Sequence, residues 1–289
     1  MEQTMNLGPS GSLWGKAANW IGFFALILVS WAALFAMSTD FAGRAPVSLL
    51  GPGMGLLAPL FPEAPGRDLL PLAFDAICFA GPSSGEAPYL VLFGMWSLMA
   101  LAMMAPTAAP MLQTYADLVA GNPKRIAPAG FWGLLAGFCL VWIGFALVAA
   151  LAQWAIARWG GMTAGGLLRS DWLAAALLSG AGLYQFTALK AACLSRCRSP
   201  MAFFLGNWRD GTGGSLRMGL QQGLACLGCC WVLMTLAFVG GTMNLVWMGA
   251  AMVLMTTEKL PLFGRHITAP LGAVLVASAL VVAWRAATV

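Results

Sequence analysis

Apolar runs long enough to cross a bilayer recur along the whole chain, and they decide its class of fold. A run of about twenty apolar residues is typical of a transmembrane helix, because a helix satisfies its own backbone hydrogen bonds within lipid. Only 9% of the residues are charged, whereas roughly a quarter are charged in soluble domains. The sequence therefore predicts an all-α, polytopic transmembrane helical bundle of about seven spans, at residues 17–37, 88–112, 130–157, 171–192, 215–239, 243–259 and 266–285.

The distribution of charge predicts the orientation of this bundle. With the N-terminus in the cytoplasm, ten Lys and Arg lie in cytoplasmic connections and five lie outside, as the positive-inside rule requires. We therefore expect a multi-pass protein of the bacterial inner (cytoplasmic) membrane whose chief partner is the lipid bilayer. Residues 1–87 hold the first span and an exterior Pro/Gly-rich segment, and residues 88–289 form the bundle with the Met and Cys motifs. The basic residues form no run or stripe, which argues against a nucleic-acid partner.

Three cysteines stand close together halfway along the fifth predicted span. On a helix, Cys226, Cys229 and Cys230 occupy positions i, i+3 and i+4 and so share one face, which Met234 extends by a turn. Thiolates and thioethers bind soft metal ions such as Cu(I). The chain has a single histidine, which disfavours haem and histidine-rich zinc sites. The alternative is that these cysteines are small buried hydrophobes.

A second cysteine pair follows the fourth predicted span. Cys193 and Cys197 are separated by one helical turn, among basic residues that favour the reactive thiolate. If this span is one straight helix, the pair lies about 15 Å from the level of the central cluster and makes a second site. If the segment folds back, the two groups form one site. A basic membrane anchor with incidental cysteines is the other interpretation.

Methionines form stripes on two further spans. Met95, Met99 and Met103 recur every fourth residue with Met104 beside them, and Met243 and Met248 begin a similar series in the sixth span. Pro106 should kink the second span and free a backbone carbonyl. The stripes suit a route for Cu(I), although methionine is also a common core residue.

The order of these motifs resembles a bacterial family of predicted metal-binding integral membrane proteins, a domain of unknown function with members linked to copper supply for polyphenol oxidases. The resemblance covers roughly residues 88–260. It implies metal binding, with copper as the favoured metal, at the positions that match the family's cysteine motifs: Cys193, Cys197, Cys226, Cys229 and Cys230. The motifs that carry it are Met95-Trp96, Ala102 to Pro106, Tyr184 to Lys190, Cys193 to Pro200, Gly223 to Trp231, Gly241 to Asn244, Trp247-Met248 and Glu258-Lys259.

The leading expectation is a protein that holds Cu(I) and hands it to a cuproenzyme or a copper chaperone. Zinc is the less favoured ion, because it usually takes four ligands whereas Cu(I) accepts two or three sulfurs. Two alternatives stay open: a membrane thiol-disulfide oxidoreductase that uses Cys226/Cys229 and Cys193/Cys197, and a structural or assembly subunit. We expect a protein that is not an enzyme, and its oligomeric state stays open.

Overall fold

The computed structural model describes residues 13–44, 51–56, 89–121, 130–163, 165–260 and 264–288. In this part of the chain the regular elements are helices, apart from an isolated bridge between Met162 and Leu168. The expected all-α class is therefore confirmed. Most of the predicted exterior segment, including Cys78 and the apolar run 69–80, lies outside the described residues.

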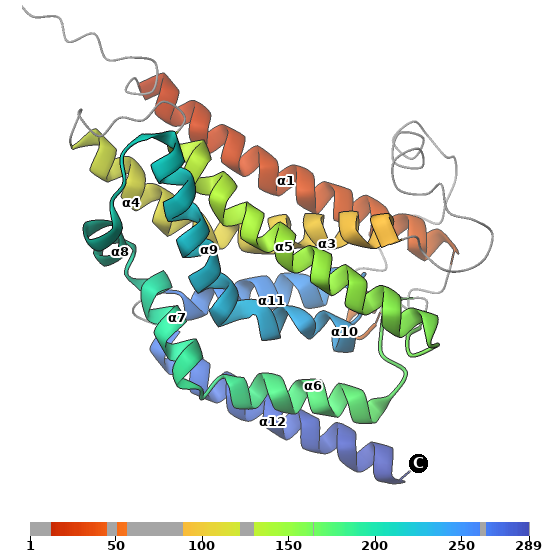
Figure 1. The fold of residues 1–289 in the computed structure, drawn as a ribbon. Coiled ribbons are helices and arrows are strands. Elements are labelled where there is room, and N and C mark those ends of the chain that lie inside the picture. Colours follow the sequence, from red (N-terminus) through yellow and green to blue (C-terminus); the bar gives the residue numbers. More distant parts are fainter. Residues whose placement is uncertain are drawn as a thin grey trace, which may run out of the picture.

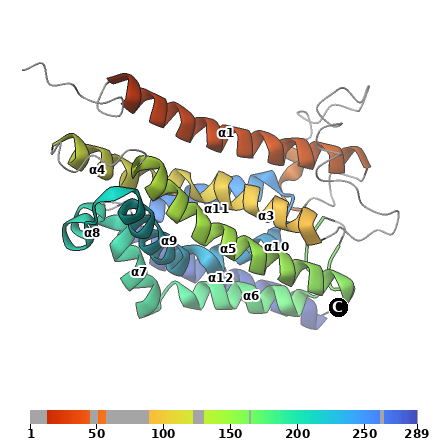
Figure 2. The ribbon, with the colours of Figure 1, turned by 45° about the horizontal axis from the view of Figure 1, so that its top comes forward.

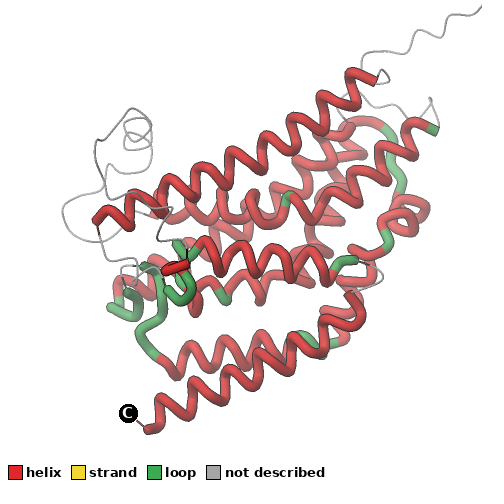
Figure 3. Tube along the Cα trace, turned by 180° about the vertical axis from the view of Figure 1, so that it is seen from behind, coloured by secondary structure: helices red, strands yellow, loops and turns green. Residues whose placement is uncertain are grey.

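The long helices lie side by side in one bundle. α1 forms one edge, α6 and α12 form the opposite edge, and α3, α5, α9 and α11 lie between them (Figures 1, 2 and 3). The elements are α1 (Leu13–Arg44), α3 (Tyr89–Met104), η3 (Pro106–Ala108), α4 (Ala109–Ala120), α5 (Gly130–Arg158), α6 (Asp171–Tyr184), α7 (Ala188–Arg198), α8 (Pro200–Asn207), α9 (Gly211–Thr235), α10 (Ala237–Gly240), α11 (Leu245–Glu258) and α12 (Gly264–Thr288).

Five helical segments of the described chain are long and apolar enough to cross a membrane, and a bent pair makes up to six. The bent pair is α6 and α7, which meet at 63°. α11 is apolar but has only 14 residues, or about 21 Å at 1.5 Å per residue, against a hydrocarbon core of about 30 Å. Membrane helices are thus present by length and composition, while the count of seven stays a prediction.

The fourth predicted span is not one straight helix but a bent pair. α6 ends at Tyr184, and α7 begins after Thr187, whose hydroxyl accepts a hydrogen bond from the Lys190 backbone N–H at 3.3 Å. The hydroxyl of Tyr184 donates to the carbonyl of Gly228 in α9. The break is therefore capped and anchored, and it turns α7 against α9.

Glycines let α9 approach its neighbours closely, as expected for a multi-helix site. A Cβ placed on Gly219 would lie 2.9 Å from the carbonyl carbon of Leu134, and one placed on Gly223 would lie 3.1 Å from the carbonyl oxygen of Phe138. Both neighbours belong to α5. Larger residues at these two positions would push the two helices apart.

Pro106 interrupts the second span between α3 and η3, and the carbonyl that it frees, as predicted, has a new partner. Proline has no N–H to donate to the carbonyl of Ala102, four residues earlier. The indole N–H of Trp31 in α1 donates to that carbonyl at 3.1 Å instead. The short η3 helix that follows carries Thr107 into the interior of the bundle.

Candidate metal centre

The three cysteines of α9 form one compact, buried cluster. The Sγ atoms of Cys226, Cys229 and Cys230 all lie within 4.8 Å of one another. Those of Cys229 and Cys230 are 3.2 Å apart, and the Cys229 thiol also lies 3.1 Å from the carbonyl oxygen of Cys226. The i, i+3, i+4 spacing thus places three sulfurs together, as the sequence predicts.

The break between α6 and α7 brings a fourth sulfur to this cluster. Cys197 Sγ lies 4.0 Å from Cys229 Sγ. Cys193, one turn earlier on α7, lies against α9, because a Cβ placed on Gly228 would be 2.5 Å from its sulfur. Of the two arrangements open from the sequence, the structure therefore has the one in which the segment folds back. We call Cys197, Cys226, Cys229 and Cys230 the sulfur cluster.

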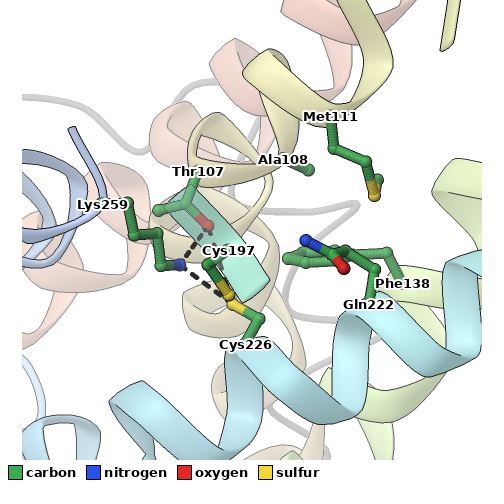
Figure 4. Close-up of a pocket in the computed structure, with 8 residues that line it drawn as sticks. All are labelled: Thr107, Ala108, Met111, Phe138, Cys197, Gln222, Cys226 and Lys259. Carbon is green, nitrogen blue, oxygen red and sulfur yellow. Dashed lines mark hydrogen bonds between the residues drawn. The ribbon is translucent and has the colours of Figure 1, made fainter. Parts of the chain in front are cut away.

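A buried lysine contacts the sulfur cluster, and sequence reasoning missed its role. Lys259 Nζ donates to Cys226 Sγ at 2.9 Å and to Thr107 Oγ1 at 2.8 Å (Figure 4). The Thr107 hydroxyl also donates to the carbonyl of Met104 at 2.7 Å. Lys259 was expected in a cytoplasmic connection as an orientation signal, but only 7% of it is exposed. The signal in the sequence is weak: Lys259 ends the apolar run 243–259, which is the shortest of the predicted spans.

A buried ion pair holds α7 to the end of α11. Lys190 Nζ lies 2.8 Å from one carboxylate oxygen of Glu258 and 3.0 Å from the other, and it also donates to Gln185. The side chains of Lys190 and Glu258 are each about 1% exposed. The Nε of Arg198 donates to the backbone carbonyl of Glu258 at 2.9 Å. Lys190 was also counted among the cytoplasmic charges; the structure shows that its charge is buried and paired with Glu258, while the topology stays a prediction.

A small cavity of about 10 Å³ adjoins the sulfur cluster and has room for about one water molecule. Its wall includes the carbonyl oxygen of the Gln222 side chain, which has no hydrogen-bond partner among the described residues. Met111 of α4 also lines it, a methionine that the sequence stripes did not single out (Figure 4). The complete lining is Thr107, Ala108, Met111, Phe138, Cys197, Gln222, Cys226 and Lys259.

The sulfur cluster and the Glu258-Lys259 pair both lie within the part of the chain that a family model matches. The model of the family described as PpoB2, copper chaperone, covers residues 93–282. The chain belongs to the PpoB2 copper chaperone family. This family is linked to copper supply for polyphenol oxidases, so the resemblance drawn from the motifs is confirmed. Comparisons with curated proteins and with solved structures gave no match.

The cysteine sulfurs of this PpoB2 member suit copper, the metal in the description of the family. Cu(I) is a soft ion that prefers thiolate and thioether ligands. Among the described residues, the group of metal-ligating side chains that lies close enough to share an ion consists of cysteines alone. Such a set differs from the histidine and carboxylate ligands that harder ions prefer.

The methionine stripes are buried in the same hydrophobic core as the sulfur cluster, and Met243 packs against that core while partly buried. Burial is what both core packing and a metal route require, so the role of these residues as ligands stays a prediction. The fully buried members are Met95, Met99, Met103, Met104, Met234 and Met248.

Proposed function

We propose that the chain binds Cu(I) at the sulfur cluster and passes it to a copper-dependent enzyme or a further chaperone. The observation that carries this proposal is the meeting of four thiol sulfurs from two helices, three of them buried, next to a buried lysine. The description of the family names copper, and thiolate ligands favour its soft Cu(I) form. A structural zinc site would need all four sulfurs as fixed ligands, but Cys197 lies on a different helix and is only partly buried, whereas Cu(I) is satisfied by two or three sulfurs.

The graded exposure of the cysteines supports delivery over permanent storage. Cys193 and Cys197 on α7 are partly exposed, while Cys226, Cys229 and Cys230 on α9 are buried. An ion that enters at α7 can move inward by exchanging one thiolate for the next, because Cys197 and Cys229 are close enough for neighbouring ligand sets. The same steps in reverse release it.

The membrane arrangement completes the proposal. We place α7 toward the cytoplasm in a seven-span, N-in topology of the bacterial inner membrane, so that exchange takes place with a cytoplasmic partner. The stripes of Met95, Met99 and Met103 and of Met243 and Met248 would form a sulfur-lined route within the bundle. Arg196 on the exposed face of α7 supports this orientation.

Metal analysis of the purified protein tests the proposal. The full chain is purified under reducing conditions from copper-supplemented and copper-depleted cells, beside a variant with Cys226→Ser, Cys229→Ser and Cys230→Ser. Cys139→Ser is the matched control, because Cys139 is a partly buried cysteine of α5 that packs against the core. We expect copper in the wild type and the control and its loss in the triple variant. Equal copper in all three proteins would contradict the proposal.

A further inference from the structure

Lys259 occupies a position where a bare positive charge is costly. Its side chain is buried directly after the end of α11. Burying an ammonium without an anion costs several kcal/mol, so such groups are paired. Among the described residues, the partners within hydrogen-bond distance of its Nζ are Thr107 and Cys226.

The neighbouring carboxylate is already committed. Both oxygens of Glu258 contact Lys190 Nζ, at 3.0 and 2.8 Å, and these two charges cancel. The hydroxyl of Thr107 is neutral. The positive charge of Lys259 is therefore directed at sulfur, and Cys226 Sγ, at 2.9 Å, is the atom that can carry the balancing negative charge.

The charge of a copper-thiolate complex matches this arrangement. Cu(I) bound by two thiolates carries one net negative charge, which is as costly to bury as the lysine alone. The complex and the Lys259 ammonium together are neutral. A third thiolate would leave an unbalanced negative charge in the bundle.

Resting on the proposed copper function, we propose that Lys259 is the counter-ion of the copper site and that it stabilises Cu(I) held by two thiolates, one of them Cys226. Lys259 thus acts through charge on the ligands and does not bind the ion. The remaining thiols of the sulfur cluster stay available to take over one ligand position during transfer.

The test measures Cu(I) affinity and copper-induced stabilisation in the full chain in detergent. Apparent dissociation constants come from competition with a chromophoric Cu(I) chelator, and the rise in Tm on adding Cu(I) is recorded for each protein. Lys259→Met and Lys259→Gln remove the charge, and Lys259→Arg keeps it. Lys16→Met is the control, because Lys16 is exposed at the start of α1.

We expect both uncharged variants to bind Cu(I) at least about tenfold more weakly, since unit charges about 5 Å apart interact strongly even at an effective dielectric constant near 20. The copper-induced rise in Tm should shrink in the same two variants and persist in Lys259→Arg and Lys16→Met. If Lys259 had only a structural role, its replacement would lower the Tm of the copper-free protein and leave the copper-induced rise in Tm unchanged.

Unchanged or tighter Cu(I) binding in Lys259→Met and Lys259→Gln would overturn the inference. It would show that the ammonium does not favour copper binding or that it competes with copper. If Lys259→Arg lost as much Cu(I) affinity as Lys259→Met, the effect would come from the shape of the side chain and not from its charge, which would also overturn the inference. So would failure of both uncharged variants to fold. If the wild type itself binds no Cu(I), the proposed function fails, which is a separate and visible result.

Discussion

The ammonium of Lys190 lies 2.8 Å from the carboxylate of Glu258 inside the helix bundle, and this contact joins α7 to the end of α11. The ion pair has two structural consequences for the site. It holds the helix that carries Cys197 against the bundle, and it places the next residue, Lys259, on Cys226.

Glu258→Gln should destabilise the protein, because it leaves the Lys190 ammonium buried without its anion. Breaking a buried pair from one side costs about 3–5 kcal/mol, so we expect a clear fall in the apparent Tm in detergent. The double variant Lys190→Met/Glu258→Met should recover much of the loss. Asp117→Asn, at an exposed acid of α4, is the control. A Glu258→Gln protein as stable as this control would refute a role for the pair in holding the fold.

Thr107→Val should weaken the anchoring of Lys259. The hydroxyl of Thr107 accepts a hydrogen bond from the Lys259 ammonium at 2.8 Å, and a hydrogen bond to a charged group contributes about 1.5–3 kcal/mol. We expect the free energy of unfolding to fall by about that amount. Thr114→Val removes an exposed hydroxyl whose bond is to the Pro110 carbonyl, and it should have little effect. Equal unfolding curves for the two variants would count against the contact.

Gly219→Ala should separate α9 from α5. The added Cβ would lie 2.9 Å from the carbonyl carbon of Leu134, and overpacking of this kind costs about 1–3 kcal/mol. Gly213→Ala, on the same helix, meets nothing within 4 Å and should be neutral or slightly stabilising. Thermal unfolding in detergent compares the two, and equal Tm values would show that the close approach is not required.

Copper should protect the sulfur cluster from alkylation. Mass spectrometry after treatment with a thiol reagent should show that bound Cu(I) slows modification of Cys197 and of the α9 cysteines. Cys139 of α5, which is not part of the sulfur cluster, should react at the same rate with and without copper. The same experiment tests the alternative function of the chain as a thiol-disulfide oxidoreductase. Disulfides between Cys226 and Cys229 or between Cys193 and Cys197 that form and disappear during turnover, with no protection by copper, would favour the enzyme.

The parts of the site that follow from helical periodicity could be predicted from the sequence. Cys226, Cys229 and Cys230 lie on one face because their spacing is that of an α-helix, and Pro106 interrupts the second span because it lacks an N–H. The close contact at Gly219 likewise depends on a property of one residue type. Each of these features is local, so one segment of sequence contains the information.

The parts that depend on tertiary contacts could not be predicted in this way. The break before Thr187 interrupts an apolar run without a proline, and it is held by the Tyr184 contact with Gly228 on another helix. Lys259 resembles an ordinary charged residue at the end of a span until the short length of α11 places it inside the bundle. Its partner Thr107 is 152 residues away in the sequence.

X-ray absorption at the copper edge of the loaded, reduced protein tests the central claim most directly. If the sulfur cluster binds Cu(I), the absorption edge is characteristic of Cu(I) and the first coordination sphere holds two or three sulfur atoms. This sulfur sphere should disappear in the variant with Cys226→Ser, Cys229→Ser and Cys230→Ser and persist in Cys139→Ser. A first sphere of nitrogen or oxygen atoms, or a sulfur sphere that is unchanged in the triple variant, would contradict it.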